Sequence, residues 1–217
     1  AIEEAIATAP TAETYYWAGM IGYQELTQEN YNQMLGKGVN QAVAGQAVVE
    51  SYDYWLEADR LAMIPTLDKK GREVVDTKTR ANITKKMLEY YKQQELVKYG
   101  IYLNEQRDFE GAYKVFKKHI EIPELDMMQN EKLQNEMPRD SIYTQYKYYT
   151  AIFAVQAAMH EEAIAVLEEL KDGDYEAISV NQFLYQEYVE LKDTVKFVAT
   201  LQNAIKRFPQ ESWFLQN

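Results

Sequence analysis

The C-terminal part of this chain repeats itself at an interval of 34 residues, and this period constrains the fold more than any other feature of the sequence. A shift of 34 residues superimposes five pairs of apolar or aromatic residues: Ala151 and Tyr185, Ala154 and Tyr188, Ala163 and Phe197, Leu167 and Leu201, Leu170 and Ala204. This interval is the length of one helix–turn–helix unit in proteins built from stacked helical repeats. The period therefore predicts antiparallel pairs of α-helices stacked on one another.

An upstream segment has the same internal spacing and so provides an independent copy. Gly100 is followed 12 residues later by Ala112 and 16 residues later by Phe116. The same separations connect two later sets, which are Ala151, Ala163 and Leu167, and Tyr185, Phe197 and Leu201. Small residues allow two antiparallel helices to approach closely where they cross, and a large residue then fills the space toward the next pair.

The pattern Tyr99-Gly100…Leu103…Ala112…Phe116…Pro123 resembles the tetratricopeptide repeat. In that family a large apolar residue, a small residue, Tyr, Ala, Phe and Pro recur at set offsets. The resemblance covers residues 93 to 209 in three copies, although Phe197 stands where Ala is usual. It implies an all-α fold, a right-handed superhelix (α-α solenoid) of antiparallel helix pairs.

We expect a single helical-repeat domain over residues 1–217, as a fragment of a longer repeat protein. The expected repeats are 12–65, 80–123, 141–173 and 178–209, separated or interrupted by insertions near 26–42, 66–76 and 124–140. In the first repeat, Gly19 or Gly22 is expected at the helix crossing. Neither Val48 nor Ala47 in its partner helix completes the pattern.

We expect a different structure in each of the insertions. Gly36 and Gly38 indicate a loop within 26–42, and 66–76 is expected to form an exposed turn. A helix is expected from near Thr79 to Asn104. The segment 124–140 is too apolar to be only a tether, so we expect it to pack on a neighbouring surface, with a short helix. Its apolar residues are Met127, Met128, Leu133 and Met137.

Short polar segments predict the turns. Asp108 is a candidate N-cap, as is Asp193 or Thr194, and Asp140-Ser141 after Pro138 indicates a helix start. Gly173 suits a left-handed position after a helix. The first nine residues resemble the end of an earlier repeat, and 212–215 resembles the start of another helix.

Composition excludes several functions. A net charge of −11 argues against a nucleic-acid partner, which requires a basic surface. With no Cys, neither disulfides nor thiol catalysis is available. No apolar run reaches the roughly 20 residues of a membrane span. His160-Glu161-Glu162 lacks a second His, and His119 is predicted to be packed. We therefore predict no catalytic residue, no metal site and no cofactor.

The family resemblance implies a binding surface. The first helices of tetratricopeptide repeats line a concave groove that holds extended peptides or partner helices. By position, the groove residues here are Trp17, Lys98, Ile101, Asn104, Tyr148, Ile152, Gln182 and Gln186. The Lys/Asn arrangement that clamps a terminal carboxylate in some members is not matched. Packing between repeats explains each of these positions equally well.

These features favour a non-catalytic scaffold that binds a protein or peptide partner. The alternative is a carbohydrate- or nutrient-binding accessory protein of a bacterial cell envelope, which would expose two or three coplanar aromatic rings. An all-helical hydrolase, with convergent acids in a deep cleft, is a third class. The Tyr-rich, acidic sequence resembles tetratricopeptide proteins of gut Bacteroidetes, many of which carry export signals, and this favours a periplasmic or exported location.

Overall fold

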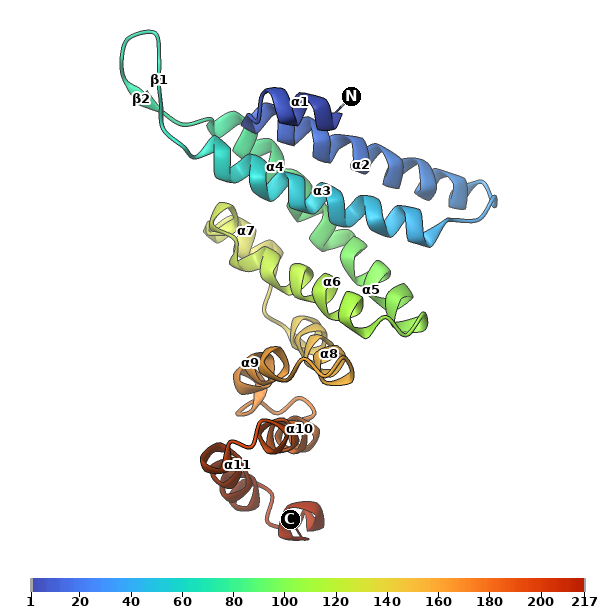
Figure 1. Ribbon diagram of the computed structural model, residues 1–217, viewed down its shortest axis with the longest axis vertical. Coiled ribbons are helices and arrows are strands. Elements are labelled where there is room, and N and C mark those ends of the chain that lie inside the picture. Colours follow the sequence, from blue (N-terminus) through green and yellow to red (C-terminus); the bar gives the residue numbers. More distant parts are fainter. Residues whose placement is uncertain (1, 217) are drawn as a thin grey trace. The chain divides into compact units, whose positions relative to one another are not determined.

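The computed structural model describes residues 2–216 and is built almost entirely from α-helices (Figure 1). Helix accounts for 77% of the chain, which confirms the predicted all-α class. Residues 1 and 217, the two ends of the expected domain, lie outside the described residues.

The chain forms two compact units. The first comprises residues 2–102 and 121–137, and the second comprises 103–120 and 138–216. The first unit contains α1 Ile2–Thr8, α2 Ala12–Met34, α3 Gln41–Ala62, β1 Thr66–Leu67, β2 Glu73–Val74, α4 Thr77–Gln93, most of α5 Glu95–Glu105, η1 Ile122–Glu124, η2 Asp126–Met128 and α7 Glu131–Glu136. The second contains α6 Phe109–Glu121 up to residue 120, α8 Ser141–Gln156, α9 His160–Leu170, α10 Ala177–Glu190, α11 Thr194–Arg207 and α12 Ser212–Gln216.

Helices α2 and α3 of the first unit pack closely because two glycines face α3. A Cβ atom on Gly22 would lie 2.7 Å from the backbone oxygen of Ala47 and 2.5 Å from Ser51 Oγ. A Cβ atom on Gly19 would lie 2.4 Å from the indole nitrogen of Trp55. Both glycines are therefore at the helix crossing, as predicted. The residues of the partner helix that lie opposite Gly22 are Ala47 and Ser51.

The predicted loop at 26–42 is wrong in extent. Helix α2 continues to Met34, and α3 begins at Gln41, after the side chain of Asn40 accepts a hydrogen bond from the backbone of Val43. Only the six residues between the helices form the loop, with Gly36 and Gly38 at positive φ. Residues 26–34 contain neither Gly nor Pro, so nothing in them ends a helix.

The single helix expected from Thr79 to Asn104 is also wrong. Gln94 has a left-handed backbone (φ 56°) and separates α4 from α5. Its backbone N–H bonds to the carbonyl oxygens of Tyr90 and Tyr91, which caps α4. Glycine or asparagine usually occupies such a position, so glutamine gave no signal of the break.

The other two insertions agree with expectation. Residues 66–76 are exposed, and they form more than a turn because β1 and β2 pair antiparallel, with Thr66 opposite Val74. The segment 124–140 contains two 3₁₀ turns and the short helix α7. Its methionines Met127, Met128 and Met137 are buried within the first unit.

In the second unit the 34-residue period of the sequence reappears in the backbone. Helices α8 and α10 end 34 residues apart, and so do the starts of α9 and α11. The turns between the paired helices have a left-handed residue at Ala158 (φ 54°) and Lys192 (φ 57°), and Arg107 (φ 62°) occupies the same place before α6.

The hydrogen bonds of these three turns are also the same. The backbone N–H after each left-handed residue bonds back five residues at 2.9 Å: Asp108 to Leu103, Met159 to Ala154 and Asp193 to Tyr188. The side chains of Asp108 and Asp193 accept bonds from the backbone N–H groups of Gly111 and Lys196, which confirms Asp108 and selects Asp193 over Thr194. Asp140 likewise caps α8, as predicted.

The prediction for Gly173 is wrong, because its φ is not positive. The left-handed residue of this connection is Glu176 (φ 47°), directly before α10. The carbonyl oxygens of Lys171 and Gly173 accept bonds from the Arg207 guanidinium instead. A side chain from α11 therefore satisfies the carbonyl groups after α9, where a glycine cap was expected.

His119 is a packed histidine, as expected. Its side chain is buried in the second unit, with its ring 5.2 Å from that of Tyr146. Burial lowers the pKa of His119 from about 6.5 to about 4. Below pH 6.5 the unfolded chain binds a proton that the folded chain excludes until the pH approaches 4, so acid destabilises the fold.

We expect the free energy of unfolding to fall by about 2 kcal/mol between pH 7.5 and pH 5 through His119. Urea unfolding of the wild type and of His119→Met at both pH values measures this contribution. The variant should lose less stability than the wild type over this interval, whatever its absolute stability. Equal losses would show that His119 is protonated in the folded chain.

Candidate functional site

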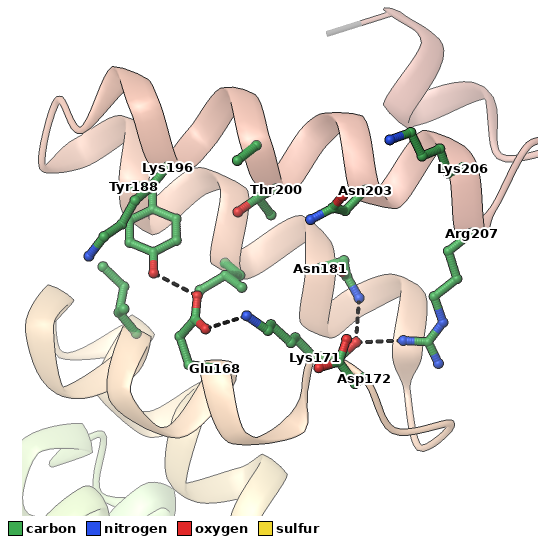
Figure 2. A pocket seen from close by; sticks show the side chains of 13 residues that line it. Glu168, Lys171, Asp172, Asn181, Tyr188, Lys196, Thr200, Asn203, Lys206 and Arg207 are labelled. Carbon is green, nitrogen blue, oxygen red and sulfur yellow. Dashed lines mark hydrogen bonds and ion pairs between the residues drawn. The ribbon is translucent and has the colours of Figure 1, made fainter.

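An open groove of about 780 Å³ lies in the second unit, between α9, α10 and α11 (Figure 2). Its lining residues are Ile164, Glu168, Lys171, Asp172, Asn181, Leu184, Tyr188, Lys196, Ala199, Thr200, Asn203, Lys206 and Arg207. Four of them are cationic and two are acidic, in a chain whose net charge is −11. The groove is therefore locally basic, although the chain as a whole is acidic.

Glu168 organises one end of the groove. It accepts hydrogen bonds from the Tyr188 hydroxyl at 2.7 Å and from the Lys171 ammonium at 2.6 Å, and Figure 2 shows both groups directed at its carboxylate. Burial acts to raise the pKa of Glu168, but these bonds and the lysine charge outweigh it and hold the pKa below its usual value. Glu168 is therefore ionised at neutral pH, and it is already occupied by protein donors.

Arg207 and Asn181 fix the other end. The Arg207 guanidinium donates to the backbone oxygens of Lys171 at 2.5 Å and Gly173 at 2.6 Å. The Asn181 amide donates to the Lys171 oxygen at 3.2 Å and to the Ala177 oxygen at 2.8 Å. These bonds connect all three helices, so the shape of the groove is fixed before any ligand arrives.

The remaining polar side chains are open to a ligand. Within residues 2–216, the side chains of Thr200, Asn203 and Lys206 make no hydrogen bond or ion pair with the protein. The Lys196 ammonium lies 3.8 Å from Asp193 and over the Tyr188 ring. Because these four residues follow a helical spacing on α11, they form one polar strip along the groove.

A smaller pocket of about 240 Å³ lies in the first unit, between α2, α3 and α5. It is lined by Leu26, Asn30, Gln33, Val39, Gln41, Ala44, Gly45, Val48, Glu95, Lys98, Tyr99 and Tyr102. Buried apolar residues of α2 and α3 form its floor, and polar residues surround them. Lys98, one of the predicted groove residues, is part of this pocket.

The other predicted groove residues lie elsewhere. Trp17, Ile101 and Gln186 are exposed, while Asn104, Tyr148, Ile152 and Gln182 are half-buried. The Tyr148 ring contacts the rings of Tyr149 and Tyr175 at angles of 51° and 66°. Of the predicted residues in the second unit, none lines the groove. A search for polar residues spaced along one face of α11 would have suggested the groove.

In the part of the chain that the structure covers, no cluster of three or more His, Asp or Glu side chains is arranged to hold a metal ion. No helix in the same region has the length and hydrophobicity needed to cross a membrane. His160 Nδ1 lies 2.7 Å from a carboxylate oxygen of the buried Glu187.

Comparison with known proteins gave no family model, no curated protein and no solved structure that matches this chain.

Proposed function

We propose that this chain is a non-catalytic interaction scaffold of the tetratricopeptide type, a right-handed superhelix of helix pairs that binds an extended segment of a protein partner. The observation that carries the proposal is the recurrence of one turn, with a left-handed residue and the same backbone hydrogen bonds, at Arg107, Ala158 and Lys192. Repeated hairpins of this kind stack into extended surfaces suited to peptide binding.

The α9–α11 groove is the proposed binding surface. Its volume lies within the roughly 300–1,000 Å³ typical of ligand sites. Lys196 and Lys206 lie ten residues apart on α11, which corresponds to about 15 Å along the helix. An extended peptide advances about 3.3 Å per residue and its side chains alternate in direction, so two acidic side chains four residues apart lie on one side of the peptide and match these two lysines. Asn203 and Thr200, between them, offer hydrogen bonds to the peptide backbone.

Charge reversal at Lys206 tests this function. We expect Lys206→Glu to weaken binding of an acidic peptide by at least about tenfold, because it replaces an attraction with a repulsion at the end of the strip. The measurement is fluorescence polarisation with three pools of labelled 12-residue peptides that are acidic, neutral or basic. The acidic pool should bind the wild type best, and added salt should weaken its binding.

Lys192→Glu is the matched control, since Lys192 is an exposed lysine of the same unit outside the groove. It should bind the acidic pool within about twofold of the wild type. The double variant Gln182→Ala/Gln186→Ala tests the first-helix surface implied by the family resemblance. Equal loss in Lys192→Glu and Lys206→Glu, or loss only in the glutamine variant, would contradict the groove as the binding surface.

A further inference from the structure

Two tyrosine rings form one wall of the small pocket in the first unit. The rings of Tyr99 and Tyr102 are nearly parallel, with 14° between their planes and 6.1 Å between their centroids. Parallel rings this far apart are displaced sideways relative to each other, so they present a continuous aromatic surface and not one ring hidden behind another. Such a surface packs against the apolar face of a flat or ring-shaped ligand.

Gly45 of α3 allows the Tyr99 ring to occupy this position. A Cβ atom at Gly45 would lie 1.8 Å from Tyr99 Cδ2 and 2.2 Å from Cγ, so no larger residue fits unless the ring moves. Glycine in the middle of a helix lowers its stability by roughly 0.5–1 kcal/mol relative to alanine. The close approach of the Tyr99 ring to α3 therefore lowers the stability of the helix, and it fixes the position of this ring in the pocket wall.

A buried carboxylate faces the same pocket. Glu95 is 4% exposed, and its Oε1 accepts a hydrogen bond from the Lys98 ammonium at 3.0 Å. Its second oxygen, Oε2, accepts no hydrogen bond from any residue between 2 and 216. Solvent reaches this oxygen from the pocket, so it can accept a hydrogen bond from a ligand there.

Three amide side chains at the rim are also unpaired. Asn30, Gln33 and Gln41 line the pocket, and their side chains make no hydrogen bond within the described residues. Of the amides on the same two helices that lie outside the pocket, Gln28 donates to Asn32 and Gln46 donates to Glu50, whereas the side chain of Gln24 makes no hydrogen bond within the described residues. Three of the four unpaired amides on α2 and α3 therefore line the pocket.

We propose that this pocket binds a single uncharged sugar ring. One face of such a ring carries C–H groups that pack on Tyr99 and Tyr102, while its hydroxyl groups donate to Glu95 Oε2 and exchange hydrogen bonds with the rim amides. The ion pair with Lys98 makes the local charge zero, which disfavours both cations and anions. The volume of about 240 Å³ is below that of drug-sized sites and limits the ligand to one ring.

This proposal is independent of the peptide groove, because every residue involved belongs to the first unit. The probes are glucose, galactose, mannose and N-acetylglucosamine, with tetramethylammonium and acetate as charged comparisons. Saturation-transfer difference NMR on the full chain, with irradiation of the tyrosine ring protons, reports binding. We expect transfer to the C–H protons of at least one sugar and none to either ion.

Three variants test whether the sugar binds in this pocket. Tyr102→Ala and Glu95→Gln should each weaken binding by about tenfold, the first by removing half of the aromatic surface and the second by replacing the acceptor with an amide. Gly45→Ala should weaken it too, by moving the Tyr99 ring. Tyr31→Ala is the control, since Tyr31 is an exposed tyrosine of α2 outside the pocket, and it should bind like the wild type.

Loss of binding is distinguished from loss of folding when each variant has the circular dichroism spectrum and melting temperature of the wild type. Because Tyr102 is half-buried and partly solvated, its truncation is compatible with folding, and Glu95→Gln keeps the volume of the side chain. Binding of tetramethylammonium in place of sugars would overturn the proposal in favour of a cation site. So would the absence of transfer to all four sugars, or sugar binding that Tyr102→Ala and Glu95→Gln leave unchanged.

Discussion

Replacing Phe116 with alanine is expected to lower the free energy of unfolding by about 3–5 kcal/mol, the usual cost of emptying the space of a buried aromatic ring. Phe116 is 1% exposed, and its ring contacts those of Tyr146, Tyr149 and Phe153 at centroid distances of 6.0, 6.4 and 5.1 Å. These contacts connect α6 to α8, so their loss loosens the packing between these two helices.

Urea unfolding, followed by circular dichroism, measures this change. Val195→Ala is the control, because Val195 is an apolar residue of the same unit that is 80% exposed, and its truncation should change stability by less than about 0.5 kcal/mol. If Phe116→Ala cost no more than Val195→Ala, the ring cluster around Phe116 would not hold α6 and α8 together.

Replacing Trp55 with alanine is the second large effect, again about 3–5 kcal/mol, and it falls on the first unit. Trp55 has no exposed surface, and its ring lies 5.1 Å from that of Tyr90 and 6.2 Å from that of Tyr23. Its indole N–H also donates to the backbone oxygen of Tyr16, and this hydrogen bond would be lost. One substitution therefore loosens α3 from both α2 and α4.

Trp17→Ala provides a matched control of the same residue type. Trp17 lies on α2 in the same helix pair, but its side chain is 54% exposed, so its removal should change stability far less than that of Trp55. Thermal unfolding of the two variants distinguishes a packed tryptophan from an exposed one. Equal losses would mean that the aromatic core of the first unit is not centred on Trp55.

The sequence predicts the helix pairs of the second unit well, because their period is carried by residues with one physical role. Ala151 and Ala163 are both fully buried, as small residues at a crossing must be, and so is Leu167. Two of the three repeated turns also have an aspartate N-cap, at Asp108 and Asp193. Met159 is at the equivalent position and has no capping side chain, yet its turn has the same backbone hydrogen bond. The recurrence of the turn therefore does not depend on the caps.

The helix boundaries of the first unit are predicted less well from the sequence, because they depend on tertiary contacts and not on local sequence signals. Residues 26–34 remain helical since nothing in them stops a helix, and burial of Leu26 ties that segment to the rest of the unit. Gln94 adopts a left-handed conformation although glutamine has no preference for it. Neither outcome follows from the local sequence.

The sequence offers a polar face on the last long helix, but it does not specify which residues complete either pocket, for a similar reason. The groove requires three helices to converge, and Arg207 reaches residues 33 or more positions away. In the small pocket, the useful facts are that Glu95 is buried and that Asn30, Gln33 and Gln41 are unpaired. Of the residues that the family resemblance suggested, Lys98 lines the small pocket, but the resemblance did not indicate which residues of α11 face the groove.

NMR mapping of peptide binding tests the scaffold most directly. An acidic 12-residue peptide with two glutamates four residues apart is titrated into the ¹⁵N-labelled full chain, and backbone and side-chain shifts are followed. We predict that the shifts concentrate on α11 and the facing residues of α9 and α10, with the largest changes at Lys196, Asn203 and Lys206. Shifts confined to other surfaces, or no shift at millimolar peptide, would contradict the proposed scaffold function of the groove.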